Sequence, residues 1–230
     1  MARTSLLVLI VALGGLMVVS AVAATKSSTP AAPAASAATP AGSTAASPAG
    51  YTGKPFGGKA RQIPGIIQAE DYDVAADNKE DVTFHYKGGA KKSDYRADSI
   101  GIAKFGGGHV STKGVPEKPD QVYLGWTQDG EWMKYTVHVA EAGTYRFGGK
   151  FAAASKNGKI SVAFTPALKI GPVAIPTTDG FQPGVEVYHV WLVSDNLGEV
   201  TLPAGDYVMQ VTLEVTGGSN MDYFTFTKKP

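Results

Sequence analysis

The stretch Gly125-Trp126-Thr127-Gln128-Asp129-Gly130-Glu131-Trp132-Met133-Lys134-Tyr135-Thr136-Val137-His138-Val139 decides the fold of this chain. It begins as a polar turn with an aromatic residue on each side and continues as a strand. The strand alternates strictly, because its apolar residues fall on one face and its polar residues and Trp132 on the other. The apolar face is formed by Met133, Tyr135, Val137 and Val139. The pattern therefore predicts a half-buried β-strand that follows an aromatic-flanked turn.

The two tryptophans beside this turn, Trp126 and Trp132, suggest a ligand. The apolar face of a pyranose ring stacks on an aromatic ring, and its hydroxyls need polar partners such as the carboxylates and amides nearby. The alternative is that both tryptophans are ordinary core aromatics of a sandwich. This stretch alone leaves both readings open.

The rest of the folded part also predicts β-structure. Short alternating runs are separated by Gly, Pro, Asn and Asp turns, and no run of ten or more residues keeps a helical period. The expected strands are Gly65–Tyr72, Val82–Tyr86, Ser99–Lys104, Glu131–Val139, Gly143–Ala152, Lys159–Phe164, Tyr188–Val193, Glu199–Leu202, Asp206–Val215 and Met221–Thr227. The fold class that follows is all-β, a β-sandwich.

One turn pattern occurs twice, as Ala142-Gly143-Thr144-Tyr145 and as Ala204-Gly205-Asp206-Tyr207. Each is expected to feed a strand, and its tyrosine often marks a corner between the sheets of an antiparallel sandwich. In contrast, residues 88–123 are rich in Gly, Lys, Asp and Pro. An irregular connection of this length is usually functional or locally mobile.

Three segments are expected along the chain. Residues 1–23 resemble a secretory signal peptide, because a basic start precedes an apolar run and the small-x-small pattern Ala21-Val22-Ala23. A permanent membrane anchor is the weaker alternative, since the run is short and contains Gly14-Gly15. Residues 24–60, rich in Ala, Pro, Ser and Thr at first, are expected to be a disordered linker, and residues 61–230 one domain. The chain has no cysteine, so an exported domain would depend on its core or on a bound ion.

The charge of the chain bears on whether it binds nucleic acid or a membrane surface. The net charge is +1, with 21 Lys and Arg against 20 Asp and Glu, and the charges are scattered. This balance gives no indication of binding to nucleic acid or to an anionic membrane surface. We expect a secreted monomer without membrane contact once the signal peptide is removed.

An ordered set of motifs then resembles a known family. Ile63-Pro64-Gly65-Ile66-Ile67-Gln68-Ala69-Glu70-Asp71-Tyr72 is similar to the opening strand of a family 6 carbohydrate-binding module. The turn around Trp126 is similar to its central signature. Further matches are Thr177-Thr178-Asp179-Gly180-Phe181-Gln182 and Asn220-Met221-Asp222-Tyr223-Phe224. The resemblance covers about Gln62 to Lys228 and implies a jelly-roll sandwich that binds polysaccharide and catalyses nothing.

The same resemblance implies site residues. Two aromatics at the loop end would clasp a sugar ring, and they match Trp126 and Phe181. Asn220 matches an asparagine that hydrogen-bonds sugar hydroxyls. Glu131 matches a recurrent acidic position and is expected either to touch sugar or to hold the turn. Tyr95 is expected either to extend the sugar surface or to pack.

A calcium site is expected at the first and last strands. Gln68 and Glu70 are two residues apart on a strand, so their side chains leave the same face. Together with Asp222 they offer hard oxygen ligands that suit calcium, and the resemblance implies a structural ion there. The alternative is a surface hydrogen-bond cluster.

Two rival functions stay open. A small jelly-roll hydrolase or lyase would need carboxylates that face each other across a cleft, and no obvious pair exists in the sequence. The histidines His85, His109, His138 and His189 lack metal-ligand spacing. A cell-surface adhesion or matrix protein could use the same fold for protein contacts.

Overall fold

The computed structural model describes residues 50–88, 93–98, 101–119 and 121–230. The expected signal peptide and most of the expected linker lie outside this part of the chain. Within it the strands are β1 Arg61–Ile63, β2 Gly65–Gln68, β3 Phe84–His85, β4 Ile102–Lys104, β5 Val110–Ser111, β6 Val122–Leu124, β7 Trp132–Val139, β8 Gly143–Ala153, β9 Lys159–Ala163, β10 Lys169–Ala174, β11 Val190–Leu202, β12 Gly205–Val215 and β13 Ser219–Lys228. Three 3-10 turns, η1 Phe56–Gly58, η2 Ala76–Asn78 and η3 Val187–His189, complete the described elements.

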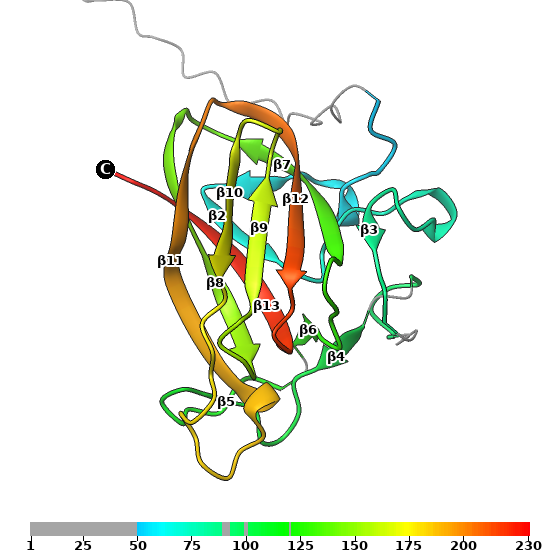
Figure 1. The fold of residues 1–230 in the computed structure, drawn as a ribbon. Helices are drawn as coiled ribbons and strands as arrows, with labels where there is room; N and C mark the ends of the chain where they lie inside the picture. Colours follow the sequence, from blue (N-terminus) through cyan, green and yellow to red (C-terminus); the bar gives the residue numbers. More distant parts are fainter. Residues whose placement is uncertain (1–49, 89–92, 99–100, 120) are drawn as a thin grey trace, which may run out of the picture. The chain divides into compact units, whose positions relative to one another are not determined.

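These strands form two sheets (Figure 1). The first runs in the order β1-β7-β12-β9-β10, with β3 paired to β7. The second runs β4-β6-β13-β8-β11-β5, with β2 paired to β13. Only β1 with β7 and β5 with β11 are parallel pairs among the described strands. The all-β sandwich prediction is confirmed.

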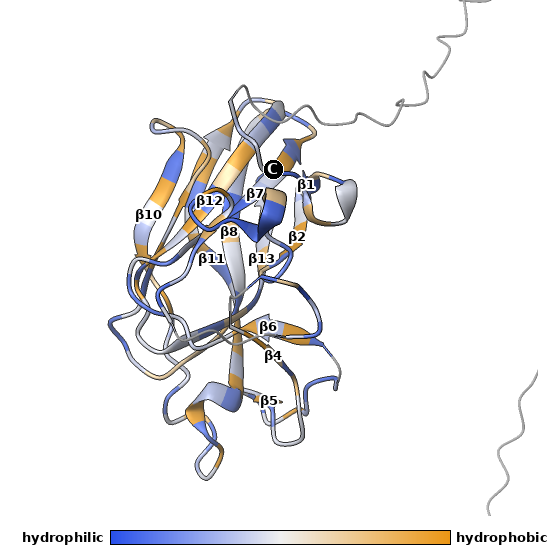
Figure 2. Cartoon of the chain, turned by 90° about the vertical axis from the view of Figure 1, so that its right-hand side faces the viewer, coloured by the Kyte–Doolittle hydropathy of each residue, from blue (hydrophilic) through white to orange (hydrophobic). Residues whose placement is uncertain are grey.

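The core lies between the sheets and follows the predicted alternation. All four apolar residues of β7 are buried, and Tyr135 meets Phe224 of the opposite sheet with ring centroids 6.0 Å apart. Figure 2 shows hydrophobic residues concentrated in strands such as β4, β6 and β12, with mostly hydrophilic or neutral connecting loops. Thr136 departs from the pattern, because it is buried on the polar face, where it donates to Asp73 Oδ2 at 2.6 Å.

Both repeated turns end in a tyrosine corner. The Tyr145 hydroxyl donates to the carbonyl of Glu141 at 2.6 Å, and the Tyr207 hydroxyl donates to the carbonyl of Pro203 at 3.0 Å. Each tyrosine thus fastens the start of its strand to the turn four residues earlier. This geometry agrees with the corner that the sequence pattern predicts.

The strand prediction differs from the structure in its details. The runs expected at Tyr188–Val193 and Glu199–Leu202 are one bulged strand, β11. The short strands β1, β5 and β6 and the Pro-containing β10 carry too little alternation to be predicted. Order also begins before residue 61, because Lys54 pairs with Val74 and the Tyr51 hydroxyl donates to Asp73 Oδ2 at 3.1 Å.

The connection between residues 88 and 123 contains β4, β5 and β6 in its described parts. It is therefore less irregular than the composition indicates. Among the residues that the structure describes, no helix has the length and apolar character to cross a membrane.

Candidate functional site

A pocket of about 590 Å³ opens among the loops at the end of the sandwich where β13 begins. Three chain segments enclose it: the turn after β6, the η3 region and the start of β13. Its lining residues are Tyr123, Gly125, Trp126, Thr127, Gln128, Glu186, Tyr188, His189, Gly218, Ser219 and Asn220. The pocket thus combines aromatic rings with amide, hydroxyl and carboxylate groups.

Trp126 is held in an unusual backbone conformation at this pocket. Its φ is +54°, a left-handed value that bulky residues rarely adopt. The neighbouring Gly125 N–H donates to the carbonyl of Gly101 at 2.8 Å, and a Cβ at Gly125 would approach Asn220 Oδ1 to 3.1 Å. The indole remains 51% exposed. Strained residues that keep a large apolar surface in solvent are typical of ligand sites.

The polar turn after Trp126 is tied to the start of β13. Thr127 Oγ1 donates to the carbonyl of Ser219 at 2.6 Å. Asp129 Oδ1 accepts the backbone N–H of Thr216 at 2.7 Å. Asp129 thereby serves the turn itself, which fixes the position of the aromatic residue ahead of it.

Tyr188 supplies the second exposed aromatic ring of the pocket. It is 39% exposed, and its carbonyl accepts an N–H from Asn220 Nδ2 at 3.1 Å. Gly218 has φ +66°, and a Cβ there would come within 3.2 Å of the Tyr188 ring. Asn220 thus lines the pocket and is hydrogen-bonded to the segment that carries Tyr188.

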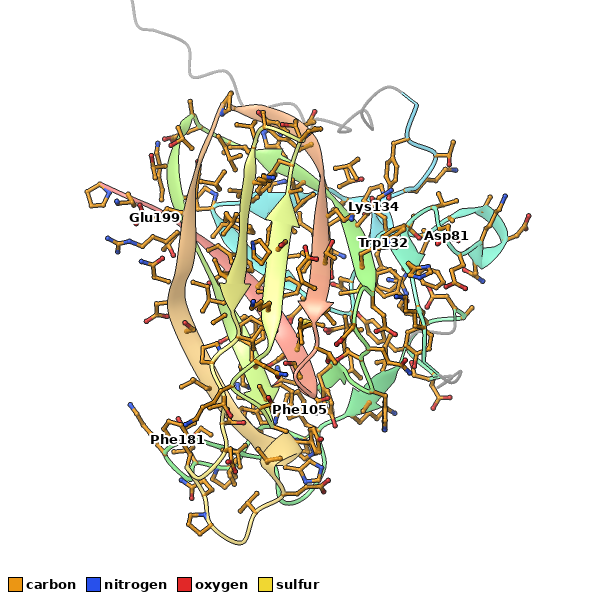
Figure 3. The ribbon with its side chains drawn as sticks, in the orientation of Figure 1. Asp81, Phe105, Trp132, Lys134, Phe181 and Glu199 are labelled. Carbon is orange, nitrogen blue, oxygen red and sulfur yellow. The ribbon has the colours of Figure 1, made fainter. Side chains whose placement is uncertain are left out.

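Phe181 does not line this pocket, which differs from our expectation of a clasp between Trp126 and Phe181. Figure 3 shows it on the loop below β11, where its side chain is 49% exposed. The next residue, Gln182, donates to the carbonyl of Thr112 at 2.8 Å and ties this loop to the one after β5. Sequence reasoning missed Tyr188. The available signal was an aromatic residue two positions before the strand β11, in the short turn η3.

Glu131 and Tyr95 are likewise not among the pocket-lining residues. Glu131 is only 2% exposed, and its Oε1 accepts the backbone N–H groups of Lys87 at 2.9 Å and Gly88 at 3.2 Å. Its carboxylate therefore fastens the segment after β3 to the start of β7. Tyr95 donates to Asp71 Oδ1 and packs on Phe56 with ring centroids 5.5 Å apart, so it packs against the N-terminal segment.

A second aromatic cluster covers the outer face of the second sheet behind the pocket. Its buried members are Phe105, Tyr123, Ala152 and Trp191 (Figure 3 labels Phe105). Ala152 alternates along β8 with core residues, which places this cluster on the opposite face of the sheet. The cluster is the support on which the pocket wall at Tyr123 is built.

Of the three predicted metal ligands, Gln68 ends β2 and Asp222 lies in β13, its pairing partner, whereas Glu70 lies in the turn after β2 and not on the strand expected to carry it. The Ala69 N–H donates to the Asp222 carbonyl at 2.9 Å, and Gln68 pairs with Tyr223. Gln68 Oε1 and Glu70 Oε2 are buried without a hydrogen-bond partner among the described residues. Burial, followed by the charges of Asp71 and Asp222, raises the pKa of Glu70 to about 8.

Asp222 is engaged differently. Its Oδ2 lies 3.0 Å from Lys150 Nζ, which also contacts Glu117 Oε2 at 2.6 Å. The two orphaned oxygens of Gln68 and Glu70 fit a hard cation. The Asp222 carboxylate could join them only in competition with Lys150.

Glu186 is the one carboxylate among the described residues that line the pocket. Glycoside hydrolysis ordinarily uses two carboxyl groups about 5–10 Å apart. The described lining thus combines one carboxylate with aromatic, amide and hydroxyl groups that can stack on a ligand and hydrogen-bond it.

Several solved structures are similar to this chain. A carbohydrate-binding module of Cellvibrio mixtus lichenase 5A, in complex with cellotriose, is 17% identical, with 73% of this chain and 99% of that chain covered and a TM-score of 0.44. A β-1,3-glucan binding module from Bacillus halodurans is 18% identical, with 73% and 98% covered and a TM-score of 0.45. An arabinoxylan arabinofuranohydrolase from Bacillus subtilis is 17% identical, with 74% of this chain but 28% of that chain covered and a TM-score of 0.45.

No curated protein sequence matches the chain. A family model does match, that of the carbohydrate binding module (family 6), over residues 103–228. The match begins after the first strands, whereas the motif resemblance begins near Gln62, and both end at Lys228. Because the matched region is more than half of the 230 residues, the chain belongs to family 6 of the carbohydrate-binding modules.

Proposed function

We propose that this protein is secreted and binds polysaccharide, without catalysing a reaction, through the pocket between Trp126 and Tyr188. The observation that carries the proposal is the composition of that pocket. Two exposed aromatic rings lie on separate segments, with Asn220 and Gln128 among the polar groups beside them. A sugar needs both kinds of group, because its ring faces are apolar and its edges carry hydroxyls.

The two rings have complementary roles in this proposal. Trp126 is the larger platform, held by the turn that Thr127 fastens to Ser219 of β13 and Asp129 to Thr216 just before that strand. Tyr188 is the second platform, and Asn220 donates to its backbone and so keeps a fixed place between the rings. Such prior ordering reduces the entropy that binding would otherwise cost.

Secretion is supported by the sequence pattern of residues 1–23. The absence of catalysis is supported by the single carboxylate among the described pocket-lining residues. A domain with these properties would bring whatever is attached to it, or the protein itself, to a polysaccharide surface.

A structural calcium ion is part of the same proposal. Gln68 Oε1 and Glu70 Oε2 would be its side-chain ligands, with Asp222 contributing where Lys150 releases it. The ion would supply a positive charge to a buried carboxylate and connect the β2 segment with β13. None of these residues lines the sugar pocket.

The direct test incubates the mature protein with insoluble cellulose, β-1,3-glucan, xylan and mannan. We expect co-sedimentation with at least one polysaccharide and no release of reducing sugar. Release of sugar would instead support the jelly-roll enzyme. Neither binding nor release would favour the adhesion or matrix protein.

A further inference from the structure

Two histidine rings are stacked at the wall of the pocket. His189, at the end of η3, lines the pocket, and its ring lies over that of His109 with centroids 3.9 Å apart and planes 28° apart. His109 comes from the loop before β5, so the stack joins two distant parts of the chain. His109 is buried, whereas the His189 side chain is about one third exposed.

His109 is fixed from behind by the outer aromatic cluster. The Trp191 indole Nε1–H donates to His109 Nδ1 at 3.1 Å. Phe105 and Tyr123 lie against the same imidazole, with ring centroids 5.2 and 5.6 Å away. Because Nδ1 accepts a hydrogen bond from the indole N–H, it carries no proton of its own. The imidazole is therefore neutral, with its one proton on Nε2.

The surroundings of His109 keep it neutral over a wide range of pH. The titratable groups that face the ring are Lys150 of β8, His189 of η3 and Tyr123 of β6. The backbone is fixed as well, because the carbonyl of His109 accepts the N–H of Glu117. Burial, followed by the nearby His189 and Lys150, lowers the pKa of His109 to about 4.

His189 itself has hydrogen-bonding capacity left over. Its Nε2 lies 3.8 Å from Glu186 Oε2, which is too long for a hydrogen bond. Among the described residues, none makes a hydrogen bond to either nitrogen of this ring. An imidazole that is about one third exposed and stacked on a buried ring, at the wall of the pocket proposed to bind sugar, is well placed to meet a sugar hydroxyl.

We propose that His189 is a ligand-contacting residue that hydrogen-bonds the bound saccharide, and that the buried His109–Trp191 pair positions it. This inference rests on the proposed function, because it assumes that the pocket binds saccharide. His109 acts as a positioning residue, since it reaches the ligand only through the ring stacked on it.

The experiment measures calorimetric affinities for cellotriose, laminaritriose, xylotriose and mannotriose. His189→Phe keeps the aromatic stack but removes the ring nitrogens. We expect it to weaken binding about three- to tenfold, the scale of one neutral hydrogen bond. His109→Phe keeps the stack and the shape but removes the acceptor of the Trp191 N–H. We expect a smaller loss, and a shift of the Trp191 indole N–H signal in the NMR spectrum.

Measuring the saccharide affinity over a pH series separates a positioning role of His109 from a general contribution to the stability of the fold. Wild-type affinity should fall as the pH drops through about 4, when His109 takes up a proton at Nδ1 and can no longer accept the indole N–H. The His109→Phe variant should lack this part of the decline. The wild-type profile tests the inference even where a variant folds poorly.

The possible results distinguish this inference from the function on which it rests. If no trisaccharide binds the wild type, both are overturned. If Trp126→Ala weakens binding but His189→Phe binds as well as the wild type, the pocket stands and the role of His189 is overturned. If both His109→Phe and the wild type show the same pH profile, the positioning role of His109 is overturned.

Discussion

Trp126 and Trp132 stand six residues apart in one stretch of sequence, yet the fold gives them opposite surroundings. Trp126 lies in a loop with φ +54°, is 51% exposed and lines a pocket. Trp132 begins β7 and is less exposed, with Lys134 Nζ 4.6 Å above its ring and the His85 ring 6.2 Å away (Figure 3). His85 is in turn held by Asp81 at 2.7 Å.

This difference shows what turns an exposed aromatic residue into a binding platform. A regular strand presents its outward residues to neighbours two positions along the strand and on the next strand, and these cover part of the ring. A strained turn, in contrast, can place an aromatic ring at the wall of a pocket, where neighbouring side chains leave it exposed. On this account Trp126 binds the sugar and Trp132 contributes to the surface of the first sheet.

Replacing each tryptophan in turn is the strongest way to break the comparison. Trp126→Ala should weaken polysaccharide binding by about 1–3 kcal/mol, the scale of a lost aromatic platform, with little change in melting temperature. Trp132→Ala is the matched control and should bind as the wild type does. Affinity measurements on the polysaccharide that the wild type retains provide the check. Equal losses for the two variants would contradict the assignment.

The structure and the motif resemblance differ in the second aromatic platform, which is Tyr188 in the structure and Phe181 in the resemblance. Tyr188→Ala should weaken binding by about 1–2 kcal/mol, because it removes the second ring of the pocket. Phe181→Ala and Phe181→Trp should each change affinity by less than about twofold, since Phe181 lies outside the lining. The same affinity assay decides. A large effect at Phe181 with none at Tyr188 would restore the original clasp.

Removing the proposed calcium ion tests whether the residues that stabilise the fold are separate from the residues that bind sugar. Chelation should lower the melting temperature by about 5–10 °C, because an ion that binds only the folded state stabilises it by mass action. Sugar affinity at room temperature should stay the same. Scanning calorimetry with and without chelator measures the first effect.

Glu70→Gln is the companion variant for that measurement. It keeps the side-chain shape but removes the charge that a cation needs, so added calcium should no longer raise the melting temperature. A chelator-insensitive wild type would mean that Gln68 and Glu70 hold no ion. Loss of sugar binding in a chelated but folded protein would place the ion in the ligand pocket.

The last variant concerns the pH dependence of stability that His109 contributes. Its pKa is lowered to about 4 in the folded protein, whereas an unfolded histidine titrates near 6.5. Between these values the unfolded state binds more protons, so stability falls as the pH is lowered from about 6.5 to about 4 and this contribution levels off below. His109→Phe should show a shallower decline of melting temperature over that range. Parallel melting curves would contradict the prediction.

The fold class and the longer strands could be predicted from the sequence because they depend on local patterns. The alternation in β7 placed Met133, Tyr135, Val137 and Val139 in the core, and the turns before Tyr145 and Tyr207 marked two corners. Where alternation was short, as in β5 and β6, the strands form because of pairing with distant partners, which sequence patterns do not reveal.

The site was predictable in part. Trp126 was singled out by its place beside the polar turn and by the motif resemblance, and Asn220 by that resemblance alone; both line the pocket. Tyr188 was missed because it was assigned to the strand expected at Tyr188–Val193, whereas it lies in η3, before β11 begins at Val190. The roles of Glu131 and of the His109–His189 stack depend on contacts between segments more than 40 residues apart, which only the folded chain brings together.

The measurement that tests the central claim most directly follows the indole N–H signals of the three tryptophans by NMR during titration with the best-binding trisaccharide. The account predicts that the Trp126 signal shifts strongly and saturates with the calorimetric affinity, while the Trp132 signal stays in place. A saturating shift at Trp132 with none at Trp126 would contradict it and would place the sugar on the face of the first sheet.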